Sequence, residues 1–162
     1  MMEKDKKNKE KNFKKKGRRA EPQEFEQRLV HLARVTRVTR GGKRLSFRAC
    51  IVIGDKKGRV GYGISKGSDV TIAINKAVSQ AKKILLPIKI QDGTISHEIK
   101  EKFGAAVVML RPAKKGRGII AGGAVRSVLE LAGYEDVVAK MIGSNNKINN
   151  VKATYNALKK LK

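Results

Sequence analysis

From Arg28 to Gly54, apolar and polar residues alternate with a period of two. Leu29, Val35 and Val38 begin this pattern, and a continuous apolar run at residues 49–53 ends it. Such alternation is typical of half-buried β-strands. The segment from Arg40 to Arg44 (RGGKR) interrupts it with two glycines between cations. The pattern therefore predicts a β-hairpin with a basic tip, whose glycines supply positive φ and whose cations point away from the core.

The pattern then changes from strand to helix. A third strand is predicted from Arg59 to Ile64, where two glycines indicate a bulge or a close approach of another backbone. After Ser68 or Asp69, either of which is a candidate cap, apolar residues recur every three or four positions until Pro87 ends the stripe. Three antiparallel strands and one helix predict a small α+β domain over residues 23–87.

The remaining residues repeat this mixture of periods and predict a second α+β domain over residues 88–162. The order is strand, strand, helix, strand, helix, with strand patterns at 95–102, 105–110 and 137–142, a helical pattern that Gly133 ends, and a last helix capped by Ser144, Asn145 or Asn146.

The segment Gly116 to Gly133 (GRGIIAGGAVRSVLELAG) combines a glycine-rich entry with an amphipathic helix. The helix can end at Gly133 in the left-handed conformation. Its entry offers no Ser, Thr, Asp or Asn to accept from the first backbone N–H groups. The helix dipole favours an anion there, and Lys114, Lys115 and Arg117 precede the helix. The segment predicts a phosphate site, with solvent or the carbonyls of a neighbouring loop as the alternative.

The net charge of the chain indicates the class of molecule that it binds. The 162 residues include 38 Lys and Arg against 14 Asp and Glu, a formal net charge of +24, which favours a polyanion such as a nucleic acid. Residues 1–22 have the composition of a disordered basic tail. Aromatic residues make up 4% of the chain and Trp is absent, which argues against a membrane-surface protein. Uncharged runs are too short to span a bilayer, and no signal peptide is visible. We therefore expect a cytoplasmic protein.

The residues offer little catalytic chemistry. Gly116-x-Gly118-x-x-Ala121 formally matches a dinucleotide-binding fingerprint, but no strand runs directly into the first glycine. Cys50 lies within an apolar run and is interpreted as a buried strand cysteine; with His31 and His97 it supplies too few ligands for a structural zinc site. We expect no enzyme, cofactor, metal or small-molecule substrate.

Several stretches together resemble one known family. They are the basic hairpin at 34–44; FRACIVIGD at 47–55 with GRVGYG at 58–63; GIIAGGA at 118–124 with Arg126, Val128, Leu129 and Glu130; and GSNN at 143–146 with Asn149, Val151, Ala153 and Thr154. On these residues the chain resembles the bacterial-type family of the fifth protein of the small ribosomal subunit. Lys147, Ser65 and Gly67 depart from the family's usual Pro, Gly and Ala.

The resemblance implies an N-terminal domain similar to double-stranded-RNA-binding modules without their first helix. It also implies a C-terminal domain containing a left-handed βαβ crossover. The positions expected to bind ribosomal RNA are Arg34, Arg37, Arg40, Gly41, Gly42, Lys43, Arg44, Arg48, Lys56, Lys57, Arg59, Lys114, Lys115 and Arg117. The positions expected to contact protein are Gly118, Gly122, Gly123 and Arg126.

The implied partners are small-subunit ribosomal RNA and proteins four and eight of the same subunit. The contact with protein four influences decoding accuracy in the family, and the hairpin reaches RNA near the decoding region and the spectinomycin site. The implied location is the ribosome, in the cytoplasm or in an organelle. A free-standing regulator that binds duplex RNA remains the alternative, because it would use the same kinds of surface.

Overall fold

The computed structural model describes residues 25–161, and the basic tail predicted over residues 1–22 lies outside this range. The elements in chain order are β1 (Glu26–Thr39), β2 (Gly42–Gly54), β3 (Arg59–Gly67), α2 (Val70–Lys83), β4 (Leu86–Pro87), β5 (Ile99–Phe103), β6 (Ala106–Pro112), β7 (Ile119–Ile120), α3 (Gly123–Ala132), β8 (Val137–Ile142) and α4 (Lys147–Lys160). Among them, no helix is long and apolar enough to cross a membrane.

The strands form two four-stranded sheets, in the orders β1-β2-β3-β4 and β5-β6-β8-β7. All neighbouring strands are antiparallel except β7 and β8, which are parallel and joined through α3. The predicted α+β class is confirmed, and β7-α3-β8 is the expected βαβ unit. The sequence pattern missed β7, because two residues are too short to show a period.

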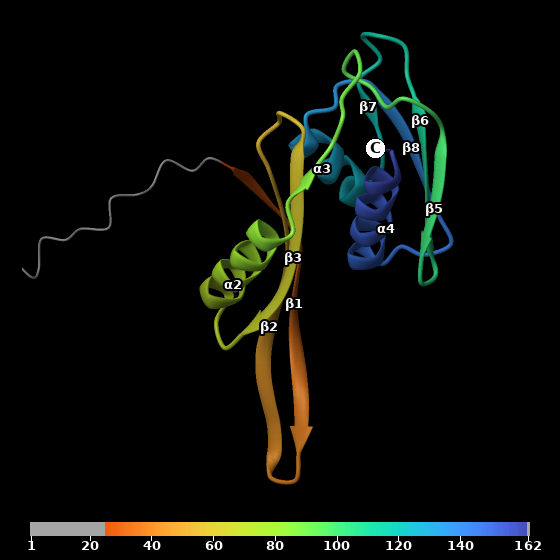
Figure 1. Ribbon diagram of the computed structural model, residues 1–162. Helices are drawn as coiled ribbons and strands as arrows, with labels where there is room; N and C mark the ends of the chain where they lie inside the picture. The colour runs from red at the N-terminus through yellow and green to blue at the C-terminus, as the bar shows by residue number, and fades with distance from the viewer. Residues whose placement is uncertain (1–24, 162) are drawn as a thin grey trace, which may run out of the picture.

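Helix α3 lies between the two sheets, whereas α2 covers the outer face of the N-terminal sheet (Figure 1). The second half of strand β2, residues 49–54, is therefore buried on both faces. Ile51 and Ile53 pack with the alanines of α2, whereas Cys50 and Val52 join the larger core that contains α3 and α4. This double burial explains why residues 49–53 form a continuous apolar run instead of alternating.

The predicted close approach at the glycines of β3 is confirmed. A Cβ on Gly63 would lie 1.9 Å from the carbonyl oxygen of Ala77, and one on Gly61 would lie 2.5 Å from that of Ala81. Glycine on the strand and alanine on the helix thus bring the two backbones together. This packing fixes α2 on the sheet with its polar face outward.

The C-terminal end of α3 docks on the turn between β2 and β3. Gly133 adopts the predicted left-handed conformation, with φ of 98°. From the turn, the backbone N–H of Lys56 donates to the carbonyl of Leu131 at 3.1 Å, and that of Gly58 donates to the carbonyl of Ala132 at 3.0 Å. Orphan carbonyls of the helix are thereby satisfied by the N-terminal sheet.

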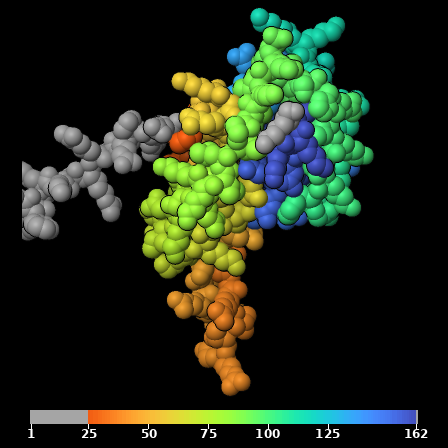
Figure 2. Space-filling view, in the orientation of Figure 1, coloured from red at the N-terminus to blue at the C-terminus, as the bar shows by residue number. Residues whose placement is uncertain are grey.

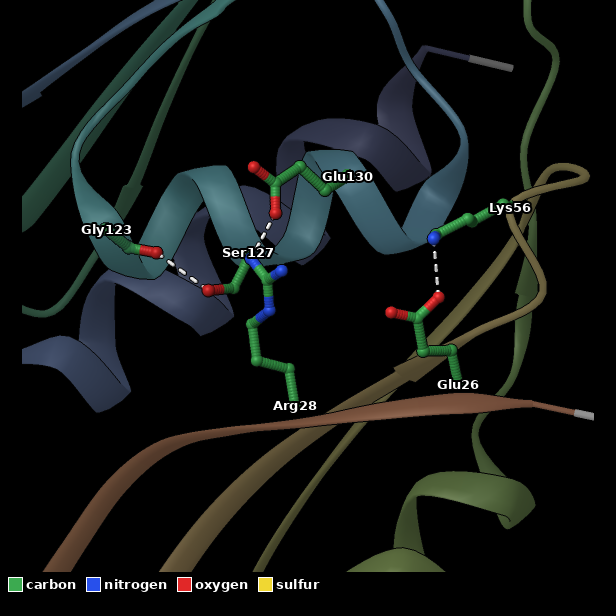
Figure 3. A network of polar contacts seen from close by, with 6 residues as sticks. All are labelled: Glu26, Arg28, Lys56, Gly123, Ser127 and Glu130. Atoms are coloured by element: carbon green, nitrogen blue, oxygen red, sulfur yellow. Dashed lines mark hydrogen bonds and ion pairs between the residues drawn. The ribbon is translucent and has the colours of Figure 1, made fainter. Parts of the chain in front are cut away.

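Two ion pairs lie at the same junction (Figure 3). Arg28 of β1 pairs with Glu130 of α3, and Lys56 Nζ lies 2.6 Å from Glu26 Oε2. The two units of the chain are therefore joined by backbone hydrogen bonds, charge and a shared core.

The first two strands differ from the prediction in their exposure. The register shifts between Leu29 and His31, so Val30 bulges and the alternation is interrupted. Leu29 is 46% exposed and Val38 74% exposed. The half-burial expected for these side chains holds for Leu29, which lies beside the start of α3. It is wrong for Val38, because the hairpin runs beyond the helices that would cover it (Figure 1).

The starts of three further elements, α4, α2 and β5, bear on the prediction. Asn146 caps α4, with its side-chain oxygen accepting from the N–H of Ile148 at 3.1 Å, as one of the three candidates. Asp69 precedes α2, but its side chain makes no capping hydrogen bond. The strand predicted at 95–102 begins only at Ile99, because Gln91 and Thr94 pair with each other in a tight turn.

Candidate nucleic-acid interface

The β1–β2 hairpin projects from the body of the molecule as a two-stranded ribbon (Figures 1 and 2). At its tip, the hydroxyl of Thr39 donates to the carbonyl of Gly42 at 3.0 Å. Gly42 has φ of 143°, whereas Gly41 is not in the positive-φ region, so the expectation of positive φ holds for only one of the two glycines. A Cβ on either residue would meet nothing within 4 Å. The tip is therefore open to a partner.

The cations of the hairpin face one another. Arg37 lies directly opposite Arg44, and at the base of the hairpin Arg48 lies opposite Lys66 of β3. Like charges at directly opposed positions destabilise a sheet. None of these four cations takes part in a salt bridge within residues 25–161. A polyanion would relieve this repulsion.

Cations lie on both faces of the ribbon. Lys43 pairs in register with Val38, and Arg34 pairs with Phe47. Both cations are on the opposite face of the ribbon from Arg37 and Arg44, because successive side chains of a strand alternate between its two faces. Arg48 differs from the others because it is partly buried, and its Nε has no hydrogen-bond partner in the described part of the chain. Arg40, at the turn, is exposed. The structure thus brings the predicted hairpin residues together on one projecting element.

The second predicted basic segment, Lys56, Lys57 and Arg59, lies at the opposite end of β2. Here the carboxylate of Asp55 accepts from the N–H of Lys57 at 2.8 Å and from Arg59 Nε at 2.6 Å. The Arg59 guanidinium also lies 5.2 Å from the centre of the Phe25 ring. With Lys56 paired to Glu26, two of these three cations are neutralised within the protein.

The environment of Asp55 fits this structural task. Burial acts to raise the pKa of the Asp55 carboxyl, but the hydrogen bonds from the Arg59 side chain and from the backbone of Lys57 and Arg59 outweigh it. The net effect lowers the pKa below its ordinary value of 3.8. Asp55 therefore stays charged and holds the turn closed.

The third predicted segment, Lys114 to Gly118, is organised by an acid of the chain itself. The N–H of Gly118 and that of Gly116 donate to the Asp136 carboxylate at 2.6 and 3.1 Å. These two hydrogen bonds lower the pKa of Asp136. Asp136 therefore occupies the backbone N–H groups of Gly116 and Gly118, whereas the phosphate site predicted at the start of the helix stays a prediction. The side chains of Lys114, Lys115 and Arg117 are exposed.

The entry to α3 has no side-chain cap, as expected, but its glycine packs against the protein itself. Gly122, the N-cap residue, has φ of −66° and no side-chain cap. A Cβ on Gly122 would lie 2.2 Å from Met141 Cε, so this glycine gives room to β8 and not only to an external partner. Gly123 and Arg126 are exposed on the first turn of the helix, whereas Gly118 lies before β7. The four predicted protein-contact residues are thus divided between two neighbouring segments.

The structure offers no catalytic arrangement among the residues it describes. Burial raises the pKa of Cys50 to about 11, and its side chain is 0% exposed, which confirms the interpretation as a buried strand cysteine. No group of three or more His, Cys, Asp and Glu gathers within residues 25–161. Because Gly116 and Gly118 donate to Asp136, the formal dinucleotide fingerprint is a turn closed by its own carboxylate.

Comparisons with known proteins identify the family. The model of the N-terminal domain of ribosomal protein S5 matches residues 25–89, and that of the C-terminal domain matches residues 101–162. The chain belongs to the ribosomal protein S5 family. The small ribosomal subunit protein uS5 of Mycoplasma mobile is 51% identical over 158 residues, which are 97% of this chain and 65% of that protein. The uS5c protein of Rhodomonas salina is 50% identical over 140 residues, covering 86% of this chain and 83% of that one.

Membership of the S5 family confirms that the chain is not an enzyme. The family consists of structural proteins of the small ribosomal subunit. Sequence reasoning missed Lys66 and Lys76, which the fold places beside Arg37 and Arg44. For Lys76, the signal was the absence of acids from α2.

Proposed function

We propose that this chain is a structural protein of the small ribosomal subunit, that it binds ribosomal RNA through the β1–β2 hairpin, and that it contacts proteins four and eight. Its place of action is the ribosome in the cytoplasm. The observation that carries the proposal is the projecting hairpin, on which Arg37 and Arg44 oppose each other and form no ion pair within residues 25–161. RNA phosphates supply the missing negative charge.

The protein contacts are proposed on the first turn of α3. Gly123 and Arg126 are exposed there, next to an uncapped helix start whose N–H groups favour an acceptor. In the family this side meets protein four. We therefore assign Arg126 to a protein contact that affects decoding accuracy, and keep Gly118 and Gly122 as residues that shape the same region.

Co-sedimentation with small ribosomal subunits tests the proposed function. The full chain should migrate with purified small subunits that lack it, and its affinity for small-subunit RNA should fall steeply with salt. With several phosphate contacts, the log–log slope should be about −4 or steeper. A nearly flat salt dependence, or no migration with the subunit, would overturn the proposal. A chain that bound duplex RNA but never entered subunits would be the free-standing regulator.

The contact through α3 has its own test. Arg126→Ala should leave the RNA affinity within about twofold, because this side chain lies on the protein-facing helix, and should alter misreading in a reconstituted translation assay. Unchanged fidelity together with weakened RNA binding would place Arg126 on the RNA instead.

A further inference from the structure

A pocket lies where β1, α3, β8 and the start of α4 meet. Its volume of about 440 Å³ is within the range of small-molecule sites. Leu29 and Val30 of the N-terminal sheet form part of the lining, and residues of the C-terminal unit form the rest. Figure 3 shows the first turn of α3 facing β1 at this junction. Ligand sites are common in such positions between two units of a chain.

The bulge in β1 gives the pocket part of its apolar lining. Successive side chains of a regular strand point to opposite faces, yet Leu29 and Val30 both line the pocket. The register shifts between Leu29 and His31, which interrupts the alternation at this point. Met141 of β8 adds a third large apolar side chain. The pocket can therefore hold a short hydrocarbon chain.

A buried amide in the lining lacks a hydrogen-bond donor. Asn150 lines the pocket and is 1% exposed. Its Nδ2 donates to the carbonyl of Ser144 at 2.9 Å, which fixes the orientation of the amide. Its Oδ1 is buried and accepts no hydrogen bond from any residue of the described chain. Because a buried acceptor without a donor is costly, a ligand that donates to this oxygen gains affinity.

The first turn of α3 supplies unpaired donors to the same pocket. Gly123 and Ala124 line it, and the helix begins after Gly122 without a side-chain cap. The backbone N–H of Arg126 donates to the Gly122 carbonyl at 2.8 Å, so the N–H groups before Arg126 have no acceptor within the helix. These groups and the helix dipole favour an anion.

The charge of the pocket also favours an anion. Lys147, at the start of α4, lines the pocket and forms no ion pair within residues 25–161. None of the described residues that line the pocket is acidic. One lysine and one helix start, beside apolar side chains, suit a monoanion such as a carboxylate better than a more highly charged ion.

These features together define the chemistry of the ligand. It needs a carboxylate for Lys147 and the α3 N–H groups, a donor for Asn150 Oδ1, and a short apolar chain. A simple carboxylate has no donor. An α-amino acid has one, but its ammonium would bring a second positive charge close to Lys147. An aliphatic α-hydroxy acid has all three groups and no second charge.

We propose that this pocket binds a small aliphatic α-hydroxy acid. The carboxylate accepts from Lys147 and the first turn of α3, the hydroxyl donates to Asn150 Oδ1, and the hydrocarbon chain packs on Leu29, Val30 and Met141. The inference goes beyond the proposed function, because it concerns the free chain and requires no RNA. Since the ligand contacts β1 and α3 together, it stabilises the junction of the two units before the protein enters the subunit.

The ligand class is tested with the full chain and four probes: α-hydroxyisocaproate, isocaproate, leucine and lactate. Isocaproate lacks the hydroxyl, leucine has an ammonium in its place, and lactate lacks the longer chain. In an NMR titration, α-hydroxyisocaproate should bind saturably and shift the amide signals of Gly123, Ala124 and residues 145–150. It should bind about fivefold more tightly than isocaproate or leucine and about tenfold more tightly than lactate. Equal affinities, or no saturable shift, would overturn the proposal.

The contact with the carboxylate is tested by removing one charge. Lys147→Gln should weaken α-hydroxyisocaproate and isocaproate alike, by about threefold or more, because both carry the carboxylate. The matched control is Lys140→Gln, which removes an exposed charge from β8 outside the pocket. The control should change either affinity less than twofold. Equal weakening by the two variants would show attraction to net charge alone and refute the site.

The hydroxyl contact is tested by Asn150→Ala. This variant should abolish the preference for α-hydroxyisocaproate over isocaproate, a ratio that a purely structural role of Asn150 would leave unchanged. A preserved preference would contradict the proposal. Circular dichroism checks the fold, because the amide also holds the Ser144 carbonyl.

A variant at an exposed position tests the site even if Asn150→Ala does not fold. Leu29 is 46% exposed, so Leu29→Ser should preserve the fold. It should weaken α-hydroxyisocaproate more than lactate, because only the former has a chain long enough to use this contact. If both affinities stayed unchanged, the pocket would not be the binding site. None of these results depends on whether the chain migrates with small subunits, so this proposal and the proposed function fail separately.

Discussion

The two ends of strand β2 carry similar basic turns that do different things. At one end, the hairpin tip (residues 39–44) has open space around its glycines, and its cations form no ion pair with any residue from 25 to 161. At the other end, in the turn at 55–59, Arg59 donates to the Asp55 carboxylate and Lys56 pairs with Glu26. The turn also donates two backbone hydrogen bonds to α3. A run of cations and glycine therefore does not define an RNA contact. The partners that the fold provides decide its role.

The largest expected difference concerns a glycine at each end. Gly133 and Gly42 both have positive φ, but a Cβ on Gly133 would lie 2.4 Å from the Lys56 carbonyl oxygen, whereas one on Gly42 would meet nothing within 4 Å. Gly133→Ala should lower the free energy of unfolding by about 3 kcal/mol, from backbone strain and overpacking together. Gly42→Ala should lower it by about 1 kcal/mol. Denaturant titration measures both, and equal losses would refute the comparison.

The next effect concerns charge. Changing Arg40, Lys43 and Arg44 to Ser should weaken binding to small-subunit RNA at least tenfold, about 1.4 kcal/mol, with little change in melting temperature. The same change at Lys56, Lys57 and Arg59 should instead lower the melting temperature and weaken RNA binding less, because two of these cations hold the turn to its neighbours. If both triple variants lost RNA affinity equally, the turn at 55–59 would be a second RNA contact.

A smaller effect is expected at Asp136. Its carboxylate holds the backbone of the loop at 114–118, whereas the cationic side chains of this loop are exposed. The hydrogen bonds from Gly118 and Gly116 lower the pKa of Asp136 from its ordinary value of 3.8. Its stabilising contribution is therefore present above pH 3.8 and is lost as the pH falls through the lowered native pKa. Asp136→Asn should lower the melting temperature by a few degrees near neutral pH. The difference from the unaltered chain should shrink below pH 3.8; a constant difference would show that the charge is not responsible.

The smallest effect is expected for the ion pair at the turn. Lys56 Nζ and Glu26 Oε2 are 2.6 Å apart, but both side chains are more than half exposed. Such pairs contribute little, so Lys56→Gln should change the free energy of unfolding by less than about 0.5 kcal/mol. A loss above 1 kcal/mol in denaturant titration would mean that the ion pair between the turn and β1, and not only the backbone hydrogen bonds to α3, holds the turn in place.

The parts of the fold that local chemistry determines could be predicted from the sequence. Gly133 ends α3 and Asn146 caps α4 as expected, because both act through their own backbone and immediate neighbours. The hairpin was found for the same reason. The bulge at Val30 and the exposure of Val38 could not be predicted, since they depend on how far the covering helices reach along the strands.

The sequence predicted the residues of the candidate site correctly only where no other described residue forms a hydrogen bond or ion pair with them. Nothing near Gly116 in the sequence indicated that Asp136, twenty residues later, would accept from its backbone. Nor could the sequence place Lys76 beside Arg44, because that proximity comes from packing α2 on β3. The division of the chain at residue 88 stays a prediction, since α3 shares its core with the N-terminal sheet.

The position of α3 has a consequence for the order of events during synthesis. The inner face of β2, with Cys50 and Val52, is covered by a helix that begins at Gly123. At about 5–20 residues per second, that helix is made several seconds after the strand it protects. Throughout this interval the nascent N-terminal sheet presents an uncovered apolar face outside the exit tunnel. Chaperone binding to stalled chains should therefore be strongest before α3 emerges and fall sharply once it has been synthesised.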